Sequence, residues 1–339
     1  DGEACFFEVL GHVDGAPTVE RDLTNVETRA QLLDERFDRT VVDHISFGRV
    51  EESLFFPQVV GNVVAGDAQF EVVFGNPKPR RNHIGLVIMG WWENVLVKTE
   101  SGWAQALAGH PSTHILKPQL SGHYSNVIFD EEHGSRLARK LRLALHATEV
   151  RQFGGTQALV IQRFDRDQGR RVHQEDFNQI LGASDNQKYQ EVGGKVSLAR
   201  IAATLARSMG DQQVAKLARL TVFATAVGNL DMQAKNISVL HPVSEQCPLA
   251  PAYDAVPQLH MPGDGRMALA INGKYRHSEI TGNDLVSELS SWGVRKADSL
   301  VQTELDELAV APHREAALPG AAEGLQEQII TTATRLAAG

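Results

Sequence analysis

The first half of the chain shows the alternation of hydrophobic and polar residues that predicts β-strands. The segment NVLVKTESGW, residues 94–103, alternates and then turns, and THILKP, residues 113–118, is a short apolar strand. A hairpin is predicted for residues 149–164, EVRQFGGTQALVIQRF, because Gly154 and Gly155 tolerate the positive φ that a tight turn demands. Between these strands, residues 131–147 have helical spacing. The apolar face of this predicted helix holds Leu137, Leu141, Ala144 and Leu145.

From Asp176 onward, helical spacing dominates instead. SLARIAATLARSMG, residues 197–210, repeats its apolar residues along one stripe, and Gly210 is its predicted stop. LARLTVFATAV, residues 217–227, is apolar on nearly all sides, which predicts a buried helix. Further helices are expected around residues 284–292, 297–309 and 321–338.

These patterns predict an α+β protein of two lobes that meet near Arg166. Residues 1–166 are expected to form a β-rich N-terminal lobe, in which residues 1–85 receive no assigned role. Residues 167–339 are expected to form an all-helical C-terminal lobe. A chain of 339 residues with 42% apolar and 22% charged residues is sufficient for a sizeable core of this kind.

Composition and charge limit the partners and the compartment. The chain carries 33 Lys and Arg against 42 Asp and Glu, and a net charge of -9 disfavours direct binding to nucleic acid. The basic runs at residues 80–81 and 136–142 are interpreted as solvated helix faces. Cys5 and Cys247 have no spacing that would suit zinc, no secretory signal opens the chain, and no apolar stretch is long enough to span a membrane. A cytoplasmic location is therefore expected.

A polar loop, GNLDMQAKN at residues 228–236, follows the buried helix directly, so that the helix is a rigid mount for Asp231. After Asn236 come a short strand, ISVL, and a loop that contains Asp254. This order of an Asp, an Asn, a strand and a second Asp is the one that phosphoryl transfer uses in protein kinases. There, the first carboxylate accepts the proton of the attacking hydroxyl, and the amide and the second carboxylate coordinate Mg²⁺. A solvated cap at a helix end is the alternative interpretation of the loop.

A kinase also needs a lysine on a strand of the other lobe, where it binds the nucleotide phosphates. Lys117 is the candidate, and an ordinary strand-end lysine is the alternative. Glu131 is expected to pair with it, although Glu132 is an equally good candidate. Phe164 is expected either against an adenine ring or in the core. The main-chain groups predicted to meet the adenine edge, at the junction of the lobes, belong to Gln162, Arg163 and Phe164.

Six motifs carry a resemblance, and they occur in the order HPSTHILKP, VIQRFDR, RRVHQEDFNQILG, KYQEVGG, GNLDMQAKN and LAPAYDAVP. From about residue 90 to residue 292 the chain resembles the HipA-type serine/threonine kinases, the toxins of bacterial toxin–antitoxin pairs. The resemblance implies a two-lobed, protein-kinase-like fold with ATP and Mg²⁺ as cofactors. It implies a protein substrate, such as an aminoacyl-tRNA synthetase, and a small helix-turn-helix antitoxin through which DNA is contacted indirectly.

The same resemblance assigns roles to particular residues. It implies that Asp231 is the catalytic base, that Asn236 and Asp254 are the magnesium ligands, and that Lys117 binds phosphate. The catalytic loop that surrounds the base also contains Gln233 and Lys235.

Two features depart from the pattern of this family. Gln233 stands where the family has His, and it offers hydrogen bonds without a charge. In the phosphate loop only Gly90 is present, followed by Trp91 and Trp92, with Asn94 where Lys is usual; bulky side chains hinder a close backbone approach to phosphates. Three functions stay open on these grounds: an active protein kinase, a nucleotide-binding pseudokinase that acts as corepressor with an antitoxin, and a small-molecule kinase.

Overall fold

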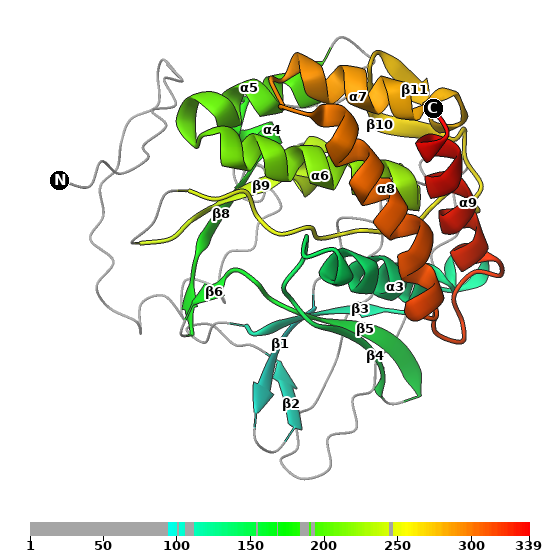
Figure 1. Cartoon of the computed structure of the whole chain (residues 1–339). Coiled ribbons are helices and arrows are strands. Elements are labelled where there is room, and N and C mark those ends of the chain that lie inside the picture. Colours follow the sequence, from blue (N-terminus) through cyan, green and yellow to red (C-terminus); the bar gives the residue numbers. More distant parts are fainter. Residues whose placement is uncertain are drawn as a thin grey trace. The chain divides into compact units, whose positions relative to one another are not determined.

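The N-terminal lobe contains a five-stranded antiparallel sheet (Figure 1). The computed structural model describes residues 94–99, 102–105, 112–153, 155–167, 169–183, 190, 194–243 and 247–339. In spatial order the strands run β2-β1-β3-β5-β4. Their bounds are β1 (Asn94–Thr99), β2 (Gly102–Gln105), β3 (His114–Pro118), β4 (Thr148–Phe153) and β5 (Thr156–Gln162). The predicted strand and turn in residues 94–103, the apolar strand at residues 113–118 and the hairpin of residues 149–164 are confirmed.

Helix α3 (Val127–Lys140) packs on one face of this sheet, where Ile128 and Phe129 form a small core with Leu159. The helix ends at Leu141 because Arg142 adopts a left-handed φ of 58°. Leu145 therefore lies beyond the helix and is 81% exposed, so its predicted place on the apolar face was wrong.

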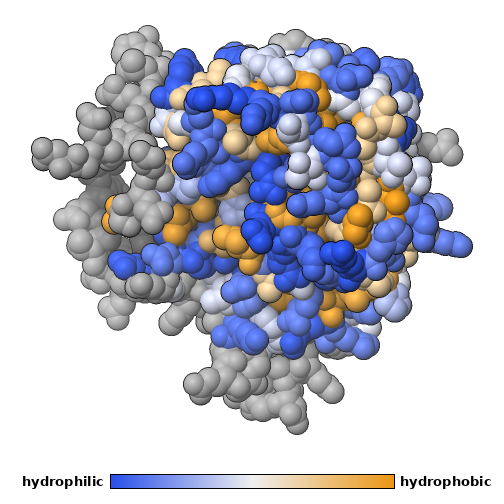
Figure 2. Space-filling model, viewed as in Figure 1, coloured by the Kyte–Doolittle hydropathy of each residue, from blue (hydrophilic) through white to orange (hydrophobic). Residues whose placement is uncertain are grey.

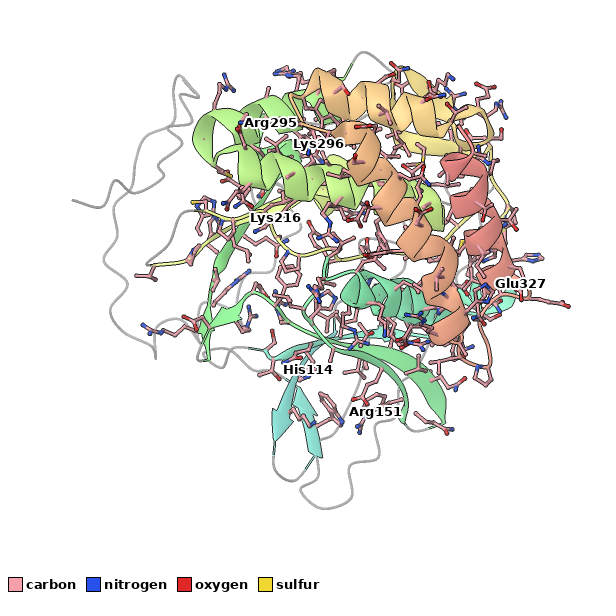
Figure 3. All side chains as sticks on the ribbon, viewed as in Figure 1. His114, Arg151, Lys216, Arg295, Lys296 and Glu327 are labelled. Carbon is pink, nitrogen blue, oxygen red and sulfur yellow. The ribbon has the colours of Figure 1, made fainter. Side chains whose placement is uncertain are left out.

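The opposite face of the sheet has an apolar cluster of its own, in which Leu116 and Val160 are buried and Trp103 packs against them. The indole of Trp103 makes an edge contact with His114, at 4.8 Å between centroids, and the guanidinium of Arg151 lies 5.7 Å from the indole centroid. Figure 3 labels His114 and Arg151 on this sheet. The two faces of the sheet thus have separate apolar clusters.

Helices form most of the C-terminal lobe, as the 3.6-residue spacing predicted. Helix α6 is central, and 10 of its side chains are buried, from Val214 to Val227. It packs against α5, α8 and α9 (Figure 1). The helix bounds are α4 (Phe177–Ile180), α5 (Leu198–Ser208), α6 (Asp211–Val227), α7 (Gly282–Ser291), α8 (Ala297–Arg314) and α9 (Leu325–Ala337).

Short strands in the same lobe correct the expectation that it is all-helical. Strand β8 (His173–Asp176) pairs with β9 (Ser238–His241), and β10 (Arg266–Ile271) pairs with β11 (Lys274–Arg276). A further pair at the lobe junction joins β6 (Arg166–Asp167) to β7 (Arg170–Arg171). Of these strands, β9 was predicted, as the short strand ISVL at residues 237–240. The others were not, because segments of two to six residues are too short to show a clear two-residue period and β8 pairs with a strand that is distant in sequence.

On the face drawn in Figure 2, hydrophilic side chains are interspersed with smaller apolar areas. The basic run at residues 136–142 is partly neutralised, because Arg136 and Lys140 lie within 3.5 Å of the carboxylate of Glu315. The other basic run, at residues 80–81, lies outside the described residues. None of the helices in the described part of the chain combines the length and the hydropathy that a bilayer span requires.

Candidate functional site

Lys117 projects from β3 to a place where two carboxylates hold its ammonium group. Its Nζ lies 2.8 Å from Oε1 of Glu131 and 2.6 Å from Oδ1 of Asp254. Glu132 forms an ion pair with Arg136 instead, at 3.0 Å, so Glu131 is the one of the two candidates that pairs with Lys117. Burial alone would lower the pKa of Lys117, but the two carboxylates outweigh this and hold its pKa well above the usual range. Lys117 is therefore charged at neutral pH.

The polar loop that was predicted to carry the chemistry begins at Gly228, at the end of α6. Gly228 has a φ of 73°, and a Cβ at this position would lie 2.4 Å from Cγ of Leu259. Glycine thus meets a conformational and a steric requirement together. Further along, Nδ2 of Asn236 donates to the carbonyl of Asp231 at 2.9 Å. This hydrogen bond fixes the side chain of Asn236 relative to the backbone of Asp231.

The carboxylate of Asp231 is mostly shielded from solvent, and two residues of the loop contact it. Gln233 donates a hydrogen bond from Nε2 to Oδ1, and Nζ of Lys235 lies 3.8 Å from Oδ2. Burial raises the pKa of Asp231 to about 7, against the charge of Lys235 and with the help of the negative charge of Asp254. A carboxylate that titrates near neutral pH is suited to accept a proton in catalysis.

Asp254 adopts a strained backbone conformation beside this loop. Its φ is 55°, in the left-handed region that non-glycine residues seldom occupy, and its carbonyl accepts a hydrogen bond from Nδ2 of Asn229 at 3.2 Å. The next residue, Ala255, approaches α3 so closely that a Cβ on Gly134 would lie 2.0 Å from its carbonyl oxygen. Gly134 was not identified from the sequence, although a glycine inside a helix costs stability and is a signal for such an approach.

The two predicted metal ligands, Asp254 and Asn236, offer a carboxylate and an amide oxygen, and oxygen donors of this kind suit a magnesium ion better than zinc. Nδ2 of Asn236 donates to the carbonyl of Asp231, so the amide oxygen is the atom of this side chain that could bind a metal ion. Among the described residues no three His, Cys, Asp or Glu side chains gather into a metal-binding group. Mg²⁺ is commonly bound by one or two protein oxygens and completed by water and phosphate, whereas structural zinc takes four nitrogen or sulfur ligands.

The three residues proposed to meet adenine differ in what their backbones can offer. The N–H of Gln162 donates to Ala147 at 2.9 Å, and the N–H of Arg163 donates to Thr113 at 2.9 Å. The N–H of Phe164 has no hydrogen-bond partner in the part of the chain that the structure describes. Of the three N–H groups, that of Phe164 is therefore the one left available to a ligand within the described residues.

A cluster of tilted aromatic rings extends from Phe164 into the site, and the sequence did not reveal it. The ring of Phe164 lies 5.6 Å from that of Tyr253 and 5.6 Å from that of His146. Tyr253 donates from its hydroxyl to the carbonyl of Lys235 at 2.8 Å. Burial lowers the pKa of His146 to about 4, so its imidazole is neutral. This aromatic cluster joins the lobe junction to the catalytic loop, and the position of Tyr253 just before Asp254 was the available clue.

Other predicted or visible features lie apart from this cluster. Gly90, Trp91 and Trp92 of the predicted phosphate loop lie outside the described residues. A cavity of about 450 Å³ opens between α9 and the segment that contains Leu259, and its lining includes His277 but none of the predicted site residues. Figure 3 labels exposed cations elsewhere on the C-terminal lobe, namely Lys216, Arg295 and Lys296.

Comparison with known proteins adds an independent finding. Residues 88–320 match the family described as HipA-like C-terminal domain. A protein of Sinorhizobium fredii named "Putative kinase Y4mE" is 32% identical over 195 residues, which cover 55% of this chain and 45% of that protein. One of Haemophilus influenzae named "Putative kinase" is 27% identical over 210 residues, or 54% of this chain and 60% of that protein. The chain thus spans less than two thirds of either relative.

A solved structure has the same fold. It is the toxin–antitoxin complex of HipA, HipB and operator DNA from Shewanella oneidensis, which matches with a TM-score of 0.62 and 24% identity over 78% of this chain and 65% of that one.

Proposed function

Because the chain belongs to the HipA-like C-terminal domain family, we propose that it forms the catalytic part of an ATP- and magnesium-dependent protein serine/threonine kinase. The observation that carries the proposal is the position of Lys117, which contacts Glu131 from its own lobe and Asp254 from the other. A protein kinase needs this lysine–glutamate pair and a metal-binding aspartate together. The relatives named as kinases and the HipA fold support the same reading.

In this proposal ATP enters between the lobes, and its phosphates meet the ammonium group of Lys117. The adenine edge accepts a hydrogen bond from the N–H of Phe164, and the adenine base lies near the aromatic cluster that Phe164 forms with Tyr253. Glu131 orients Lys117 and is itself shielded from solvent. Because water screens charges poorly in such a site, the ion pair of Lys117 and Glu131 places a strong positive charge where the phosphates would bind.

The magnesium ion would be held by the carboxylate of Asp254 and the amide oxygen of Asn236, with phosphate oxygens and water as its remaining ligands. Bound there, it neutralises charge that develops on the transferred phosphoryl group. Lys117 contacts Asp254 at 2.6 Å, so the carboxylate is already placed beside the charge that binds the phosphates.

Asp231 is the proposed general base, which takes the proton of a serine or threonine hydroxyl. Its pKa, raised to about 7 chiefly by burial, makes the carboxylate a stronger base than an exposed Asp. Gln233 donates to one carboxylate oxygen, which leaves Oδ2 to face the hydroxyl, with Lys235 nearby. General-base assistance of this kind contributes about 10²–10⁴-fold to the rate.

The proposed substrate is a host protein, such as an aminoacyl-tRNA synthetase, and the proposed partner is a small DNA-binding antitoxin. The complex of the Shewanella oneidensis protein with HipB and operator DNA supports the partner by likeness of fold. A pseudokinase that acts as corepressor is the second candidate. It is favoured by Gln233, which replaces a chargeable residue and occupies one oxygen of the proposed base.

One experiment tests the proposal against both alternatives. The protein is incubated with labelled ATP and Mg²⁺ in a host lysate, in parallel with Asp231→Asn. The kinase proposal expects a phosphorylated protein band with the parent and its loss with the variant, while both bind MgATP. MgATP binding without any transferred label would favour the pseudokinase, label in small molecules alone would favour a metabolite kinase, and no MgATP binding would reject the whole assignment.

A further inference from the structure

Asp130 is a fully buried carboxylate on α3 that none of the chemistry above employs. It lies directly before Glu131, the partner of Lys117. Its Oδ1 accepts a hydrogen bond from the backbone N–H of Ala322 at 2.9 Å, and its Oδ2 lies 3.1 Å from Nε2 of His260. Burying a carboxylate is costly unless its oxygens are engaged, so this residue needs an explanation.

Ala322 lies in the segment that joins α8 to α9, residues 315–324, and we name residues 315–322 of this segment the C-terminal strap. The strap contacts α3 along most of its length. Nη2 of Arg136 donates to the carbonyl of Ala316 at 2.8 Å, and Nδ2 of Asn126, at the start of the helix, donates to the carbonyl of Gly320 at 2.7 Å. Hydrogen bonds thus join α3 to the strap at three places: near the start of the helix, at Asp130 and close to the end of the helix.

Apolar contacts join the same two segments. Leu318 and Ala321 of the strap pack against the cluster that contains Phe129. Gly320 has a φ of 110°, and a Cβ on it would lie 2.8 Å from the ring of Phe129. Glycine is therefore required here both for its conformation and for the close approach of the strap to the helix.

His260 supplies the contact from a third segment. It lies six residues after Asp254, in the same stretch that carries Ala255 against Gly134. Asp130 therefore touches the strap on one side and the segment that follows the magnesium aspartate on the other. A shift of α3 would break both contacts and would move Glu131 away from Lys117.

We infer that Asp130 and the C-terminal strap position α3 so that Glu131 holds Lys117 in its phosphate-binding place before any nucleotide arrives. Asp130 is a positioning residue in this scheme, since it acts on Lys117 through Glu131 and touches no substrate. The inference rests on the proposed function only in taking Lys117 as the phosphate-binding lysine. In protein kinases whose helix with the lysine-pairing glutamate moves, an event such as phosphorylation of the activation loop places that helix. In this chain the C-terminal strap places α3 instead.

The test uses the full chain and two independent variants, Asp130→Ala and Gly320→Ala. The first removes the acceptor for the N–H of Ala322, and the second forces the strap away from Phe129. Asp130→Asn is the conservative variant, because its amide oxygen can accept the same N–H. Asp284→Asn is the matched control: Asp284 is a buried carboxylate in the cap of α7, remote from α3 in the hydrogen-bond network.

Two measurements are made on each folded variant. The first is the rate at which an amine-acetylating reagent modifies Lys117 without nucleotide, followed by mass spectrometry. Both strap variants should react faster than the parent, since Glu131 would no longer hold and shield the amino group that it contacts at 2.8 Å. The second is MgATP affinity, which should fall about tenfold, the equivalent of roughly 1.4 kcal/mol. Asp130→Asn and Asp284→Asn should remain near the parent in both.

The outcomes separate this inference from the proposed function. Faster acetylation of Lys117 in both strap variants, with the controls unchanged, supports the positioning role even if the parent fails to bind MgATP, a result that would overturn the kinase proposal alone. If the parent binds MgATP but acetylation of Lys117 is equal in all variants, the strap does not position α3 and the inference is rejected. An equal effect of Asp284→Asn would also reject it, because the change would then reflect general loss of stability.

Discussion

Replacement of Asp231 by Asn should make the protein more stable at high pH while it strongly slows phosphoryl transfer. Burial raises the pKa of Asp231 from 3.8 to about 7, so between these pH values the carboxyl of Asp231 keeps its proton in the folded protein and has lost it in the unfolded chain. Between these two values, stability falls as pH rises, since the unfolded state has lost its proton and the folded state must follow. Above pH 7 the carboxyl of Asp231 is ionised in both states, and the full loss of folding stability caused by its burial is present. Asn has no charge to lose and escapes this penalty.

The size of the effect follows from the two pKa values. At about 1.36 kcal/mol for each unit, the difference between 3.8 and about 7 corresponds to roughly 4 kcal/mol, an upper limit because partial exposure lets water relieve some of the cost. Asn can still accept the hydrogen bond from Gln233. The variant should therefore exceed the parent in unfolding free energy by about 1–4 kcal/mol at pH 8.5, and the gain should shrink progressively toward pH 5.

Urea unfolding of parent and Asp231→Asn, without nucleotide or magnesium, measures the difference at several pH values from 5 to 8.5. Other titrating groups are common to both proteins and cancel in the comparison. A difference that does not change with pH, or a variant that is less stable than the parent at pH 8.5, would refute the reasoning. In the transfer assay at saturating MgATP, the same variant should lose about a hundredfold or more in rate with nearly unchanged nucleotide affinity. Equal rates would remove Asp231 from the mechanism.

Three further predictions follow from named contacts. Lys117→Ala should weaken MgATP affinity by about tenfold or more, measured by titration calorimetry, because a charge that faces the phosphates is lost; unchanged affinity would contradict the placement of the nucleotide. Gly134→Ala should impair MgATP binding, since the new Cβ would lie 2.0 Å from the carbonyl oxygen of Ala255, and a normal melting shift with MgATP would show that the two segments part easily. Arg219→Met should lower the unfolding free energy, measured by urea unfolding, by about 2–3 kcal/mol, because it leaves the buried carboxylate of Glu304 without its partner. A loss below about 0.5 kcal/mol would show that this ion pair contributes little to stability.

Local pattern was sufficient for most of the individual elements. The hairpin of β4 and β5, the strand with Lys117 and the buried helix α6 were predicted because hydrophobic period and turn glycines act over a few residues. The order of Asp231, Asn236 and Asp254 likewise indicated the chemistry before any geometry was known. Prediction failed where the local signal ended without warning, as at Leu145, which lies beyond a helix stopped by the left-handed turn at Arg142.

The sequence alone determined most of the longer helices and strands and the polar residues that follow them, since spacing along the chain fixes these features. Only the tertiary structure decided that Lys117 pairs with Glu131 rather than Glu132, and that it also meets Asp254, a residue 137 positions away. It alone revealed the approach of Ala255 to Gly134 and the strap across α3. Such contacts depend on how whole elements pack, and packing is set by the summed fit of many distant side chains, which no short stretch of sequence encodes.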